Sequence, residues 1–230
     1  MRVVFFGNSE SAFSNRHYAA LRAAPCTVAA VVDAPPAKRA STNPTAPTTN
    51  FVADAQAAGI PTCAPASPNT ADCVASLAAL APDLFVAVGY TNLLKSALLQ
   101  TPRLLAVNFH ASLLPAYRGR HPLYWALKNG EKAAGLTVHV MDEGFDTGDI
   151  LYQAAVPIEP ADTVASLYER VMDASTPLVE RLIRDAAAGA LVRTPQGAVG
   201  ASYYGRISQE SSLQAVEHRL KPLLQAQHTD

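Results

Sequence analysis

The sequence predicts an α/β fold, with a mostly parallel sheet and helices on both of its faces. Short apolar runs alternate with Ala- and Leu-rich stretches of helical pattern through the first half of the chain, and such alternation is typical of parallel sheets. The chain has 230 residues, 49% of them hydrophobic, which is enough for one large core. Sites in sheets of this kind lie beyond the carboxyl ends of the strands.

In the first half, continuous apolar runs predict buried strands at residues 2–6, 27–33 and 83–88. Helical patterns predict helices at 11–23, 50–59 and 71–81. Asn50 is a candidate N-cap and Gly59 a candidate C-terminal residue of the second helix. Residues 34–49 form a long loop rich in Pro, Thr and Ala, and a loop of that length is either functional or disordered.

In the second half, strands are expected at 104–110, 135–141 and 149–156, with a short helix at 121–129. Residues 162–189 have the apolar spacing of one long helix, which Pro177 should kink. The pattern then changes to short β-prone pieces at 190–205 and a polar helical tail. We therefore expect a catalytic domain at 1–189 and a short C-terminal extension at 190–230.

Composition excludes several classes of protein. Because 18 basic residues face 19 acidic ones, the chain offers no basic field for a long nucleic acid, and none is expected as a partner. Its three cysteines form no C-x-x-C pair, so we expect buried free thiols rather than disulfides or zinc. No apolar stretch is long enough to span a membrane. A soluble, cytoplasmic protein with no membrane partner is the simplest interpretation.

The stretch NFHASLLPAYRG at 108–119 places an amide and an imidazole two positions apart at a strand end. Side chains at i and i+2 of a strand leave on one face, so Asn108 and His110 should project together while Phe109 packs the other way. Together they could hold a carbonyl oxygen and stabilise negative charge on it. The alternative is a pair of polar residues that bind nearby backbone.

The segment DEGFDTGD at 142–149 gathers four carboxylates and two glycines. Asp and Gly dominate ordinary turns, so a structural role is one interpretation. The other is a carboxylate that orients His110, raises its pKa and relays a proton. Ligand spacing for a metal is absent nearby, and no metal is expected.

The two motifs, with Ser112-Leu-Leu-Pro and Arg118-Gly119 between them, resemble the formyltransferase family that uses 10-formyltetrahydrofolate. The resemblance covers roughly residues 1–205. It implies a Rossmann-like formyltransferase fold and a catalytic trio that maps onto Asn108, His110 and Asp146. It also implies 10-formyltetrahydrofolate as co-substrate and no metal.

In that family the pterin of the folate lies in an apolar pocket built from two loops, largely through backbone groups. The resemblance carries the folate-binding positions to Val88, Gly89, Tyr90, Leu93, Leu94, Met141, Asp142, Gly144 and Phe145.

The segment at 117–125, with Asn129-Gly130-Glu131 after it, looks most like formyltransferases that act on nucleotide-linked amino sugars, especially UDP-4-amino-4-deoxy-arabinose. The tail piece at 203–206 also looks like theirs. Two arginines can bind a diphosphate and an aromatic ring can stack on a base or sugar. The expected acceptor-binding residues are Gly7, Asn8, Ser9, Arg118, Gly119, Arg120 and Trp125. Solvated surface for the arginines and core packing for Trp125 are the alternatives.

Two other branches of the family are disfavoured, and a third stays open. Glycinamide ribonucleotide enzymes have a glycine-rich first turn that this chain lacks. Methionyl-tRNA enzymes have a more basic loop and a further C-terminal domain, and peptide or natural-product amines are not excluded. Without the larger C-terminal domain of many relatives, the acceptor pocket would be incomplete or be finished by a partner subunit, such as the second copy in a homodimer. The contrasting class is a folate- or nucleotide-binding protein without turnover.

The remaining histidines are expected to be structural or exposed. His139 alternates with valines on a strand, where a hydrogen-bonded structural role is the favoured interpretation. His17, His218 and His228 are expected on the surface.

Overall fold

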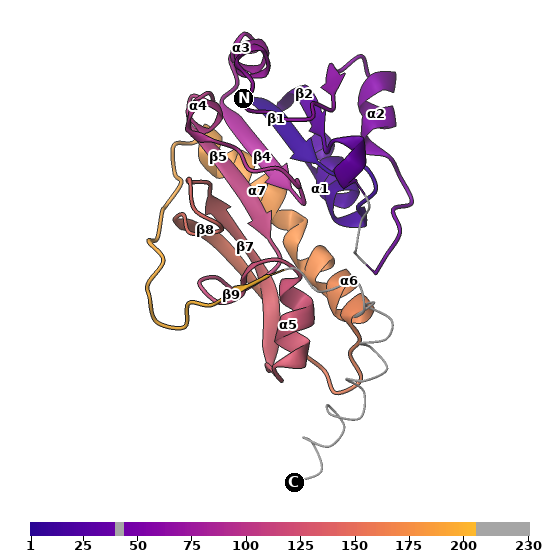
Figure 1. The fold of residues 1–230 in the computed structure, drawn as a ribbon, viewed down its shortest axis with the longest axis vertical. Helices are drawn as coiled ribbons and strands as arrows, with labels where there is room; N and C mark the ends of the chain where they lie inside the picture. The colour runs from indigo at the N-terminus through magenta and orange to yellow at the C-terminus, as the bar shows by residue number, and fades with distance from the viewer. Residues whose placement is uncertain (40–43, 206–230) are drawn as a thin grey trace.

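A seven-stranded sheet forms the centre of the structure, a computed structural model that describes residues 1–39 and 44–205 (Figure 1). A second, two-stranded sheet lies beside it. The strands are β1 (Arg2–Gly7), β2 (Thr27–Asp33), β3 (Thr62–Cys63), β4 (Leu84–Val88), β5 (Leu105–His110), β6 (Arg118–Gly119), β7 (Ala133–Val140), β8 (Ile150–Pro157) and β9 (Tyr203–Tyr204).

Helices occupy most of the segments between the strands. They are α1 (Ala12–Ala23), the 3-10 helix η1 (Pro36–Lys38), α2 (Phe51–Ala57), α3 (Ala71–Ala78), α4 (Ser96–Leu99), α5 (Pro122–Lys128), α6 (Val164–Ser175) and α7 (Pro177–Ala187).

The strand order of the large sheet is β3-β2-β1-β4-β5-β7-β8. The five strands from β3 to β5 run parallel, and β7 and β8 are antiparallel to their neighbours. The chain therefore leaves β4 and β5 at the same edge of the sheet, which is where sites are expected in such folds.

Apolar side chains of the strands feed two cores, one on each face of the sheet. On β1, Val3 and Phe5 pack with α1, α2, α6 and α7, whereas Val4 and Phe6 pack with α3 and α4. The alternation follows from the two-residue period of a strand. The predicted α/β fold, with helices on both faces of a mostly parallel sheet, is confirmed.

Some local expectations are corrected. The segment 162–189 forms two helices rather than one kinked helix: α6 ends at Ser175 and Pro177 occupies the first turn of α7, where a missing N–H costs nothing. Cys63 is exposed and the other two cysteines are half-buried, although all three are free. The predicted polar helical tail, with His218 and His228, lies outside the described residues.

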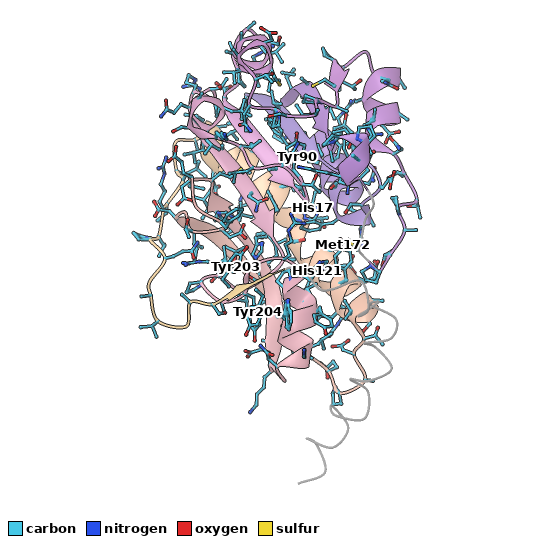
Figure 2. The ribbon with its side chains drawn as sticks, in the orientation of Figure 1. His17, Tyr90, His121, Met172, Tyr203 and Tyr204 are labelled. Atoms are coloured by element: carbon cyan, nitrogen blue, oxygen red, sulfur yellow. The ribbon has the colours of Figure 1, made fainter. Side chains whose placement is uncertain are left out.

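His17, expected on the surface, is a fully buried residue of α1 whose ring contacts Ser175 of α6 (Figure 2). Its Nδ1 lies 2.8 Å from the Phe13 carbonyl oxygen and its Nε2 lies 2.9 Å from the Ser175 hydroxyl. Both ring nitrogens thus have partners, so the ring can be buried without an unsatisfied group. Burial lowers the pKa of His17 to about 4.

Candidate active site

Strand β5 brings Asn108 and His110 to the carboxyl edge of the sheet on one face. Phe109 points to the other face, where it is 2% exposed and contacts the buried ring of His17. The register with β7 sets His139 opposite Asn108 and Thr137 opposite His110. Two imidazoles and an amide therefore lie side by side at this edge.

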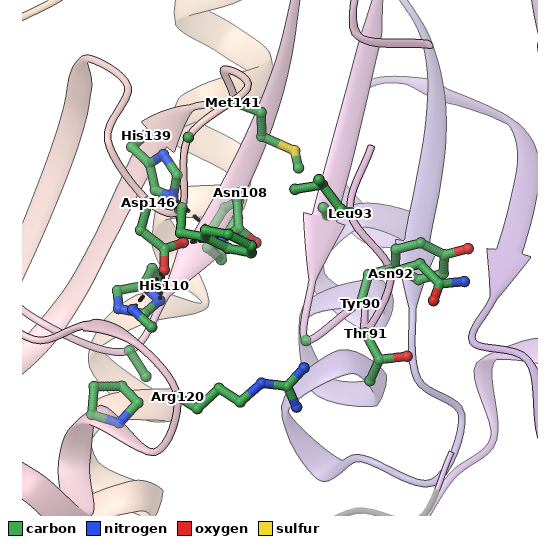
Figure 3. Close-up of a pocket in the computed structure, with 18 of the residues that line it drawn as sticks. Tyr90, Thr91, Asn92, Leu93, Asn108, His110, Arg120, His139, Met141 and Asp146 are labelled. Carbon is green, nitrogen blue, oxygen red and sulfur yellow. Dashed lines mark hydrogen bonds and ion pairs between the residues drawn. The ribbon is translucent and has the colours of Figure 1, made fainter. Parts of the chain in front are cut away.

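Asp146 approaches the same place from the turn between β7 and β8. Its Oδ2 accepts a hydrogen bond from the Gly119 N–H at 2.9 Å and lies 3.6 Å from His110 Nδ1. Its Oδ1 accepts a hydrogen bond from Asn108 Nδ2 at 3.3 Å and lies 3.4 Å from His139 Nε2. One carboxylate thus contacts three polar side chains and a backbone amide (Figure 3).

Backbone carbonyls fix the orientation of both imidazoles. His110 Nε2 donates to the Tyr117 carbonyl at 2.8 Å, and His139 Nδ1 donates to the Val140 carbonyl at 2.9 Å. A carbonyl only accepts, so those nitrogens carry the protons. The other nitrogen of each ring is left facing Asp146.

Burial and neighbouring charge together leave the pKa values of both His110 and Asp146 below their ordinary values. Burial lowers the pKa of His110 below its ordinary value, although the Asp146 charge and the bond to the Tyr117 carbonyl act against it. The sequence argument expected a raised pKa here, and burial outweighs that effect. Burial raises the pKa of Asp146, but His110, His139 and the Gly119 amide lower it more, so its pKa is below the usual range. An ionised carboxylate therefore faces a neutral imidazole at neutral pH.

A cavity of about 310 Å³ opens directly onto this cluster. Asn108, His110, His139 and Asp146 form one wall, and the loop at 90–93 forms the facing wall (Figure 3). Three large apolar side chains at its rim are exposed: Leu93, Phe145 and Tyr203. The cavity thus has a polar end at the cluster and large apolar side chains along part of its mouth.

Most residues expected at the folate site line this cavity: Gly89, Tyr90, Leu93, Met141, Asp142, Gly144 and Phe145. Val88 and Leu94 do not, because both are fully buried in the cores beneath. The Thr91 hydroxyl, on the cavity wall, is buried without a hydrogen-bond partner in the described part of the chain. A bound ligand could form the hydrogen bond that this hydroxyl lacks.

Only some of the expected acceptor-binding residues lie at the cavity. Gly119 and Arg120 line the cavity, and Arg120 extends along its mouth towards Thr91 (Figure 3). Arg118 instead donates to Gln196 Oε1 through Nε at 3.1 Å and Nη2 at 2.7 Å. Trp125 stacks on Tyr204 with ring centroids 4.9 Å apart. Neither Arg118 nor Trp125 is among the lining residues.

The turn after β1 is likewise not among the residues that line the cavity. Ser9 donates its backbone N–H and its hydroxyl to the Asp33 carboxylate at 2.8 and 2.7 Å. Asp33 is 2% exposed and also pairs with Arg39 at 2.8 Å. Asn8 donates to the Arg39 carbonyl, so the polar groups of this turn serve internal contacts.

The structure adds site residues that sequence reasoning did not select. His139 was assigned a structural role, yet it contacts both Asn108 and Asp146. The available signal was its position two residues before Met141, an expected folate-binding residue, because side chains at i and i+2 of a strand leave on one face. Tyr203 and Gln196 come from the C-terminal extension, whose pairing with distant segments no local pattern indicates. Over residues 1–39 and 44–205, no cluster of His, Cys, Asp and Glu has the makings of a metal site, and no helix there is long and apolar enough to cross a membrane.

Fold and site together define the class: an open α/β domain with an ionisable cluster at the carboxyl edge of its sheet, where such domains bind ligands. The chain belongs to the formyl transferase family, whose model matches residues 1–183.

Known proteins support this membership. The chain is 40% identical over 207 residues to the methionyl-tRNA formyltransferase of Synechococcus sp. (strain JA-3-3Ab), covering 88% of this chain and 63% of that protein. The glycinamide ribonucleotide transformylase 1 of Symbiobacterium toebii has 29% identity and a TM-score of 0.68, over 86% of this chain and 94% of that one. An N-formyltransferase from Helicobacter canadensis, solved with folinic acid and dTDP-3-aminofucose, shares the fold at 18% identity and a TM-score of 0.66, over 89% and 70%. The chain spans less than two thirds of the first of these relatives.

Proposed function

We propose that this protein transfers the formyl group of 10-formyltetrahydrofolate to a primary amine. The observation that carries the proposal is the convergence of Asn108, His110 and Asp146 on one end of a cavity, in a chain of the formyl transferase family. The apolar side chains at the mouth and the Thr91 hydroxyl, which has no partner among the described residues, fit a flat, polar-edged ligand such as a pterin.

In the proposed reaction the amine attacks the formyl carbon, a new C–N bond forms, the bond to the folate N10 breaks, and the amine's proton passes to N10. The Asn108 amide and the Nδ1–H of a protonated His110 hold the oxygen on which negative charge develops, since His110 Nε2 is already bound to the Tyr117 carbonyl. That charge favours the protonated form of His110, and Asp146, 3.6 Å from Nδ1, acts as its counterion. The Asn108 contacts of 3.2 and 3.3 Å are long, so its N–H groups can turn to a substrate oxygen at small cost.

The acceptor is a separate question. The sequence favoured a nucleotide-linked amino sugar, and Arg120 at the cavity mouth supports it because a guanidinium can bind a diphosphate. Two of the groups invoked with it, Arg118 and Trp125, are engaged elsewhere. The curated relatives at 36–42% identity act on methionyl-tRNA by their names, which favours that acceptor as a second candidate despite the net charge of −1.

One assay tests both parts. The protein is incubated with 10-formyltetrahydrofolate and, in turn, methionyl-tRNA, dTDP-3-aminofucose and UDP-4-amino-4-deoxy-arabinose. Tetrahydrofolate release is followed and the formylated product is identified by mass. We expect transfer to one acceptor, with His110→Ala as the inactive control. Folate binding without transfer to any amine would instead indicate a non-catalytic binding protein.

A further inference from the structure

The segment that follows α7 returns along the active site. Thr194 forms a β-bridge with Ile150, and β9 pairs in parallel with β6 through Tyr203 and Tyr204. Figure 2 labels these two tyrosines. Between these two attachment points lies Gln196. The extension thus passes across both segments that meet at Asp146, the turn at 142–149 and the loop that carries Gly119.

The side-chain amide of Gln196 joins these two segments. Its Nε2 donates to the carbonyl oxygens of Asp146 at 2.9 Å and Gly148 at 2.7 Å. Its Oε1 accepts from Arg118 at 3.1 and 2.7 Å. An amide has two donor hydrogens and two acceptor lone pairs, so every polar position of this one is used.

Asp146 is a residue whose backbone needs such support. Its φ is +55°, a left-handed conformation that is uncommon for residues other than glycine and persists where the surroundings hold it. Gln196 binds the carbonyl of this same residue. Through Arg118 it also holds the neighbour of Gly119, whose N–H binds the Asp146 carboxylate at 2.9 Å.

We propose that Gln196 is a positioning residue of the active site: it locks the backbone of Asp146 against the Arg118–Gly119 strand and so aims the Asp146 carboxylate at His110. The proposal rests on the formyl transfer proposed above, in which Asp146 acts on His110. It assigns Arg118 to the support of the site, and it makes the extension part of the catalytic unit.

Two substitutions distinguish the loss of the amide's hydrogen-bond donors from the loss of its whole side chain. Gln196→Glu keeps the size and the acceptor for Arg118 but removes both donors and sets an anion against two carbonyls. Gln196→Ala removes the whole bridge without adding charge. Gln56→Glu is the matched control, since Gln56 is an exposed amide on α2 that contacts Thr62. Melting temperature and the Kd of 5-formyltetrahydrofolate report on folding and on the cavity.

The first readout is kcat with the acceptor that the wild-type protein formylates. A displacement of about 1 Å costs on the order of a hundredfold, and we expect losses of about ten- to a hundredfold in both Gln196 variants, with the Kd of 5-formyltetrahydrofolate within about threefold of wild type. In an Asp146→Asn background the same substitutions should cost little more, because the residue through which they act is already lost. Additive losses, or wild-type kcat in both variants, would overturn the proposal.

The second readout does not need turnover. Hydrogen exchange of the Gly119 amide, followed by NMR, reports on its bond to the Asp146 carboxylate. We expect at least tenfold faster exchange in both Gln196 variants and no change in Gln56→Glu. Unchanged exchange at Gly119 would refute the positioning role of Gln196, and this readout needs no formylation activity. If the wild-type protein formylated none of the amines tested, that result would refute only the proposed function.

Discussion

Replacing Gly119 with alanine should disable the site without filling the cavity. Gly119 has a φ of +96°, and an added Cβ would lie 2.2 Å from the Tyr204 carbonyl oxygen. Carbon and carbonyl oxygen make close contact at roughly 3.3 Å, so the two strands must separate by about 1 Å. The Gly119 N–H faces away from β9, towards Asp146, so this separation would displace it relative to the carboxylate that it binds. We expect a loss of about a hundredfold in formyl-transfer rate, measured with saturating co-substrate and acceptor, and a lower melting temperature.

Gly200→Ala is the matched control. Gly200 lies in the same extension with a φ of +76°, but no atom lies within 4 Å of an added Cβ. It therefore carries the cost of the left-handed backbone, about 1 kcal/mol, without the collision. We expect a small fall in melting temperature and a normal rate. If Gly119→Ala also kept a normal rate, the inference that the Gly119 N–H holds the Asp146 carboxylate in place would be wrong.

Three further predictions concern the site and the core. Asp146→Asn and His110→Ala should each fold and bind 5-formyltetrahydrofolate yet lose at least about a hundredfold in rate; near-normal turnover in either would contradict the mechanism. Because the folded pKa of His17 is about 4 against 6.5 unfolded, the unfolded chain takes up the proton first. Urea titrations should therefore show the free energy of unfolding fall by roughly 3 kcal/mol between pH 6.5 and pH 4, with this pH-dependent step absent in His17→Gln. Thr137→Val should lower the free energy of unfolding by about 1–3 kcal/mol. It removes the buried hydroxyl that accepts a hydrogen bond from the Leu114 N–H at 3.0 Å and leaves that N–H without a partner; an unchanged melting temperature would count against this.

Local pattern was enough for most of the fold. The buried strands are continuous apolar runs, and the bounds of β2 match the expected 27–33. The Asn50 side chain caps α2 as expected, by accepting hydrogen bonds from the N–H groups of Val52 and Ala53. The shared face of Asn108 and His110 needed only the two-residue period of a strand.

What local pattern did not supply is the pairing of distant segments. His139 meets Asn108 because β7 runs antiparallel to β5 in one particular register, which no periodicity specifies. His17 looked like a surface residue because its partner, Ser175, lies 158 positions away. The same holds for Gln196, whose three partners come from two other segments.

The turn after β1 carries a consequence for which ligands the protein can accept. Strand-to-helix turns of this kind often bind phosphate through backbone N–H groups, but here Asp33 supplies the anion from within, held by Ser9 and by Arg39 at 2.8 Å. The Asp33 carboxylate therefore already occupies the donors that could bind a phosphate at this turn, and its charge disfavours a phosphate there. An Asp33→Ala substitution would leave the two Ser9 donors and the Arg39 guanidinium without their anion, so we expect the variant, unlike the wild-type protein, to bind inorganic phosphate at this turn.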